Sequence, residues 1–140
     1  MSGEFQRLYS GRLWSILSWD QLTAFWDRLD AEGWYLYAVG EPVPAAPAPA
    51  EQTREFVRRV DRLLRDDHRH DYCGIVYVDD LERPGFLKIY DPNNLGVSCG
   101  FSTNPPLPGW IMSRVPPEDL QAERTPPEGR RRWWRALFPA

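Results

Sequence analysis

The sequence has few of the residues that mark several protein classes. It contains one lysine, Lys88, and only two cysteines, two histidines and two methionines among 140 residues. No run of about 18 apolar residues is present, so an ordinary membrane-spanning helix is not expected. Residues 1–4 lack the basic and then apolar pattern of a secretory signal. We therefore expect a cytoplasmic protein with reduced thiols.

The charge pattern and the known catalytic motifs exclude further classes. Acidic residues outnumber basic ones, and a net charge of -3 gives no global positive field, so nucleic acid is not an expected partner. Arginine, alanine and proline in place of lysine are typical of a GC-rich bacterial genome. The sequence has no Gly-rich phosphate loop, no H-E-x-x-H and no G-x-S-x-G. An enzyme is thus less expected than a binding protein, and no cofactor is expected.

Apolar periodicity predicts two helices. An S-x-x-Q capping box, Ser18 to Gln21, precedes an aromatic repeat and predicts a helix over residues 19–31 that ends before Gly33. A second helix is predicted over residues 51–67, with i,i+4 ion pairs on a solvated face. Its apolar face consists of Phe56, Val60, Leu63 and Leu64.

Runs of strand-forming residues predict one sheet. The predicted strands are residues 34–39, 74–78, 86–90 and 97–101, with 110–112 as an edge strand and 11–17 as a short strand or docked arm. The three consecutive runs 74–78, 86–90 and 97–101 are predicted to form an antiparallel meander. The expected fold is α+β, with two helices on one mainly antiparallel sheet of four to six strands. Residues 1–129 form this single domain, with an internal Pro/Ala connector at 41–50 and an Arg/Trp-rich tail at 130–140.

Tyr77-Val78-Asp79-Asp80 resembles the Y-x-D-D turn of reverse transcriptases, in which adjacent carboxylates hold a divalent metal. The resemblance covers four residues. Nucleotidyl transfer also needs a further carboxylate, for which Asp91 is the candidate, and a basic channel for template and primer. An acidic chain of this length does not supply that channel, so ordinary turn-forming aspartates are expected.

The histidines and cysteines define the alternative function. His68, His70, Cys73 and Cys99 have the ligand types of a zinc site, but their spacing is not that of paired ligand knuckles. Cys99 with His68 or His70 is the corresponding nucleophile hypothesis. The alternative is thus a small enzyme or a ligand-binding or metal-binding domain. The default interpretation is two structural thiols, with Cys99 facing the core.

Two segments are candidate partner sites. The loop at 91–96 concentrates polar groups, and its candidate contacts are Asp91, Asn93 and Asn94. The tail interleaves guanidinium groups with indoles, and its candidate contacts are Arg131, Arg132, Trp133, Trp134 and Arg135. Trp and Arg are enriched at protein hot spots, which favours a protein partner over nucleic acid. Docking of the tail on its own domain is the equal alternative, and removal of 130–140 is expected to leave the domain folded.

The leading hypothesis is a small accessory or regulatory protein that acts by binding another protein. Residues 71–80 (DYCGIVYVDD) and 88–100 (KIYDPNNLGVSCG) are similar to small proteobacterial proteins encoded beside large redox-enzyme operons, such as those for nitrogen fixation. No defined motif carries this similarity. It implies a partner in a larger redox-enzyme system.

Overall fold

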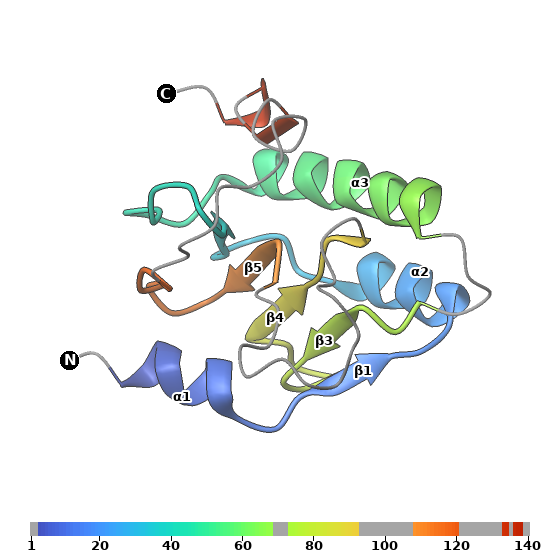
Figure 1. Ribbon diagram of the computed structural model, residues 1–140, viewed down its shortest axis with the longest axis horizontal. Helices are drawn as coiled ribbons and strands as arrows, with labels where there is room; N and C mark the ends of the chain where they lie inside the picture. Colours follow the sequence, from blue (N-terminus) through green and yellow to red (C-terminus); the bar gives the residue numbers. More distant parts are fainter. Residues whose placement is uncertain (1–2, 69–72, 93–107, 121–132, 135, 139–140) are drawn as a thin grey trace, which may run out of the picture.

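The computed structural model describes residues 3–68, 73–92, 108–120, 133–134 and 136–138, and it forms one α+β domain over them (Figure 1). The expected fold class is confirmed, with one helix more than predicted in this part of the chain. In chain order the elements are α1 (Glu4–Ser10), β1 (Trp14–Ile16), α2 (Trp19–Arg28), β2 (Tyr35–Ala38), α3 (Ala50–Asp67), β3 (Val76–Val78), β4 (Phe86–Ile89) and β5 (Trp110–Ser113). None of the described helices has the length and apolar character needed to cross a membrane.

The strands form an antiparallel sheet in the order β1-β3-β4-β5-β2. The prediction of an edge strand at 110–112 is wrong, because β5 lies between β4 and β2 and all four of its side chains are buried. The predicted meander is wrong in its third strand, because β4 has β3 and β5 as its two neighbours and β5 takes the position that the meander gave to 97–101. The expected strand at 97–101 lies outside the described residues.

Helices cover both faces of the sheet (Figure 1). α2 and α3 pack on one face and build the larger core with Phe25, Phe56 and alternate strand residues such as Leu87. α1 lies on the opposite side and contributes Phe5 to a second, smaller core. That core also contains Tyr37, Val39, Phe86 and Ile111. The alternation of side chains along each strand divides the two cores.

Local signals set the helix boundaries. The capping box of α2 is confirmed, because the Ser18 hydroxyl accepts from the Gln21 N–H at 3.0 Å and the Gln21 side chain bonds back to Ser18. α2 ends at Arg28, three residues earlier than predicted. The Asp30 carboxylate accepts from the Glu32 N–H at 3.0 Å, and this local turn replaces helical bonding. α3 begins one residue before the predicted start and ends where predicted.

Candidate functional site

His68 and Cys73 lie in the interior. The His68 ring is 7% exposed, and its Nε2 donates to the Cys73 carbonyl at 3.0 Å. Cys73 is fully buried, and burial raises the pKa of its thiol. His70 and Cys99 lie outside the described residues. Within the described ranges, no group of three or more His, Cys, Asp or Glu side chains is placed to hold a metal ion.

The adjacent aspartates of the β3–β4 hairpin bond to backbone amides of the turn. Asp79 Oδ1 accepts from the N–H groups of Gly85 and Phe86, at 2.9 and 3.0 Å. Asp80 Oδ1 accepts from Glu82 and Arg83 in the same way, and these bonds lower the pKa of the Asp80 carboxyl. This is the turn chemistry expected of the motif.

The predicted loop contact Asp91 is buried, with 4% of its surface exposed. Its backbone approaches the segment that leads into β5: a Cβ added at Gly109 would lie 3.1 Å from the Cβ of Asp91. The buried position of Asp91 therefore gives no support to a partner contact through its side chain. Asn93 and Asn94 lie outside the described residues.

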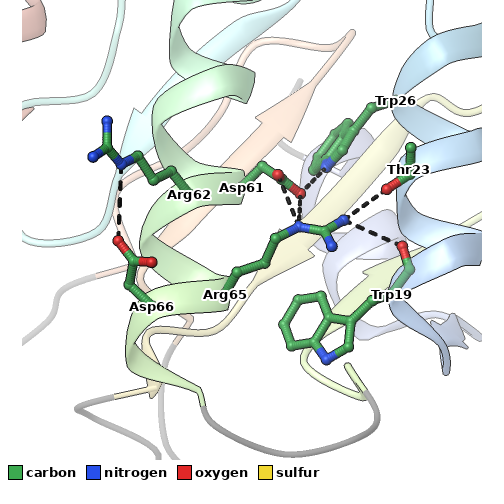
Figure 2. Close-up of polar contacts among 7 residues, drawn as sticks. All are labelled: Trp19, Thr23, Trp26, Asp61, Arg62, Arg65 and Asp66. Carbon is green, nitrogen blue, oxygen red and sulfur yellow. Dashed lines mark hydrogen bonds and ion pairs between the residues drawn. The ribbon is translucent and has the colours of Figure 1, made fainter.

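Arg65 joins α3 to α2 instead of lying solvated on a charged face (Figure 2). Its Nε bonds both carboxylate oxygens of Asp61, at 3.1 and 2.9 Å. Its Nη2 donates to the Thr23 hydroxyl at 2.7 Å and to the Trp19 carbonyl at 3.2 Å. Asp61 also accepts from the Trp26 indole N–H at 3.2 Å. This network fixes α2 against α3. Because its polar groups bond to one another, they do not form a ligand site.

The described residues of the tail dock on their own domain and form the C-terminal turn, residues 133–134 and 136–138. The Phe138 N–H donates to the Trp134 carbonyl at 2.8 Å, and Trp134 and Leu137 are each 9% exposed. Trp133 lies against Trp110, with 5.5 Å between ring centroids. The structure thus favours the docking alternative for both tryptophans. Arg131, Arg132 and Arg135 lie outside the described residues.

The Pro/Ala connector is tied down beside the edge strand β2. The Glu41 N–H donates to the Ala38 carbonyl at 2.9 Å, where β2 ends. The Ala48 N–H donates to the Trp34 carbonyl at 2.8 Å, just before β2 begins. Both ends of the connector are therefore held, and the prolines between them limit its conformations.

The connector and the C-terminal turn line an open groove of about 660 Å³, which we call the connector groove. Its walls are connector residues 41–44 and 46–49, together with Leu36, Gln52, Trp134 and Phe138. Sequence reasoning singled out the connector and Trp134 but gave no signal that they share one site. Leu36 and Gln52 were missed, because neither residue stands out from its strand or helix pattern.

Comparisons of the chain with protein-family models, curated proteins and solved structures find no match. A functional proposal for this protein therefore rests on the geometry of its described residues.

Proposed function

We propose that this protein acts by binding another protein, and that the connector groove receives an apolar segment of that partner. The observation that carries the proposal is the meeting of the connector and the C-terminal turn around one apolar groove of about 660 Å³. Clefts of this size accommodate drug-sized molecules and so have room for several large side chains.

The lining favours apolar side chains over a hydrogen-bonded strand. Four of the lining residues are prolines, at positions 42, 44, 47 and 49, and proline has no backbone N–H to offer to a ladder. Trp134 and Phe138 contribute aromatic surface, which is enriched where proteins bind each other. A partner would thus be held by anchoring side chains, with Glu41 and Gln52 as the polar groups that orient it.

The alternative, an enzyme or metal site that uses Cys99 with His68 or His70, has less support. His68 is buried, its Nε2 donates to the Cys73 carbonyl, and among the described residues no group of three or more His, Cys, Asp or Glu side chains is placed to hold a metal. The further expectation, of a partner in a larger redox-enzyme system, gains no support from the described residues or from the comparisons.

Two neighbouring alanines provide a matched test of the groove. Ala46 lines the groove and is exposed, whereas Ala45 is exposed but is not part of the lining. Ala46→Arg fills the groove with a charged side chain, and Ala45→Arg places the same charge one residue away. Surface substitutions of this kind change stability by about 0.5 kcal/mol or less. Each immobilised variant is used to capture proteins from an extract of the native cell.

The proposal predicts a protein that the parent chain and Ala45→Arg capture equally and that Ala46→Arg fails to capture. Equal capture by all three chains would place binding elsewhere and overturn the groove proposal. Native mass spectrometry of the parent chain could instead show a bound small apolar compound. If no captured protein depends on the groove, that result would mean that the groove binds a small ligand and not a partner protein.

A further inference from the structure

Lys88 is the only lysine among the 17 basic residues of the chain. It lies in β4, two residues after Phe86, which packs in the smaller core. Because alternate residues of a strand share a face, Lys88 belongs to the face of the sheet on which α1 packs. Its side chain is partly buried, and its Nζ lies 3.8 Å from the centroid of the Tyr9 ring. Position 88 therefore holds a cation that is partly withdrawn from water.

No carboxylate neutralises this cation within the described part of the chain. None of the ion pairs found there includes Lys88. Burial lowers the pKa of the Lys88 ammonium, as expected of a cation that loses water without gaining an acidic partner. The Tyr9 ring attracts the ammonium on one side, but a neutral ring brings no negative charge. Such a cation favours an anion as its partner.

Three tyrosines place neutral hydrogen-bond donors near Lys88. Tyr77 lies directly opposite Lys88 in the β3–β4 register, and Tyr90 follows on the same face of β4. The Tyr77 and Tyr90 rings meet edge-on, with 5.7 Å between centroids. Burial and then the Tyr90 phenol raise the pKa of Tyr9 to about 12, so these two phenols are also neighbours. Phenols keep their protons at neutral pH and can donate them in hydrogen bonds.

We propose that these four residues, the tyrosine–lysine cluster, bind the carboxylate of a small aromatic acid. Lys88 brings one positive charge, which one carboxylate neutralises, and the phenols donate to the carboxylate oxygens. The Tyr77 and Tyr90 rings offer edge and face contacts to the ring of the acid. All four side chains are partly exposed, so the acid reaches them without an opening of the fold.

The inference does not depend on the proposed function. The tyrosine–lysine cluster lies on the face of the sheet that carries the smaller core. The connector groove is lined by Leu36, Gln52 and Trp134, and Leu36 and Trp134 belong to the larger core on the opposite face. Loss of binding at one site therefore leaves the other site intact.

Titration of the full chain with benzoate, followed by ligand-observed NMR, measures the binding. A Kd of about 1 mM is expected for so small a ligand. Lys88→Met keeps an apolar stem over Tyr9 but removes the charge, and it should raise the Kd at least tenfold. Arg54→Met removes the same charge from an exposed residue of α3 that joins no described ion pair, and it should leave the Kd unchanged. Thermal unfolding of each variant checks that it is folded.

Two further comparisons decide the inference even if Lys88→Met does not fold. Tyr77→Phe keeps the ring but removes one donor, and it should raise the benzoate Kd about threefold or more. Benzamide has nearly the shape of benzoate without its charge, and it should bind the parent chain at least tenfold more weakly.

Four results would overturn the inference. The first is the absence of saturable benzoate binding up to about 10 mM, ten times the expected Kd. The second is a benzoate Kd that neither Lys88→Met nor Tyr77→Phe changes. The third is benzamide binding as tight as that of benzoate. The fourth is displacement of benzoate by a tenfold lower concentration of inorganic phosphate, which would assign the cluster to phosphate instead of a carboxylate.

Discussion

The Trp134 ring meets Phe56 edge-on, with 6.1 Å between the ring centroids and 87° between the ring planes. Phe56 is fully buried on α3, so this contact connects the C-terminal turn to the centre of the larger core. Phe138 packs on the same indole, with 4.3 Å between ring centroids. Trp134 is therefore both a core residue and a wall of the connector groove.

Trp134→Ala should lower the free energy of unfolding by about 3–5 kcal/mol, because it removes a buried aromatic ring and leaves a cavity. Urea denaturation followed by circular dichroism measures this change. The sequence predicted that the domain stays folded when residues 130–140 are removed. The docking of Trp134 predicts instead that this removal markedly destabilises the domain. Ala136→Ser, at an exposed position of the same turn, is the control and should stay within about 0.5 kcal/mol of the parent chain. A change at Trp134 no larger than at Ala136 would contradict the docking.

Trp26→Phe should cost about 1 kcal/mol, because the benzyl ring keeps most of the packing but loses the N–H that donates to Asp61. Trp26 is partly buried, so a larger loss is not expected. A double-mutant cycle with Asp61→Ala, which removes the acceptor, isolates the pair, and a coupling energy near 1 kcal/mol is expected. Strict additivity of the two substitutions would show that the hydrogen bond does not form.

Tyr9 gives a testable dependence on alkaline pH. Its ring lies under the Lys88 ammonium, 3.8 Å from Nζ to the ring centroid, and burial raises the pKa of the Tyr9 phenol to about 12. The unfolded chain ionises this phenol near pH 10, whereas the folded chain retains the proton. The stability that Tyr9 contributes is therefore fully present below pH 10 and is lost as the pH rises towards 12.

Tyr9→Phe removes this titration but keeps the ring. The free energy of unfolding of the variant should fall less steeply than that of the parent chain between pH 10 and 12. Urea denaturation at pH 9, 10 and 11 measures the two slopes. Parallel slopes would show that the Tyr9 phenol ionises alike in the folded and unfolded chains.

Cys73 should be alkylated by iodoacetamide roughly a hundredfold more slowly in the folded chain than in urea, because it is fully buried and burial raises its pKa. Mass mapping of the peptides separates Cys73 from Cys99 in the same sample. Rapid labelling of Cys73 in the folded chain would show that this region opens readily. The rate at Cys99 tests the prediction that both thiols are structural.

Local sequence signals predicted the elements whose stability is local. The capping box at Ser18 indicated the start of α2 to the residue, and the strong apolar face of 51–67 indicated both ends of α3 to within one residue. α1 was missed because Gly3 offers no capping side chain and the helix buries only Phe5. Such a short helix is held by tertiary packing, here of Phe5 on Phe86 at 5.6 Å between ring centroids, and local propensity does not reveal it.

Non-local relationships were the ones that the sequence did not reveal. The run 110–112 is short and follows a proline-rich segment, which is typical of an edge, yet β5 lies inside the sheet. Likewise, two adjacent tryptophans suit a partner's surface and a protein's own core equally well. The connector groove depends on how β2, α3 and the C-terminal turn pack together. The spacing of residues along the chain does not reveal this tertiary packing.

The most direct test of the proposed function is photo-crosslinking from inside the groove. Benzoylphenylalanine at position 46 reacts only with groups a few ångströms away, and the same residue at position 45 is the matched control. Irradiation in the native cell should link position 46 to one other protein, through a peptide rich in apolar residues, and position 45 should give little of that product. Absence of a protein adduct at position 46, or an equal yield from both positions, would contradict binding in the connector groove.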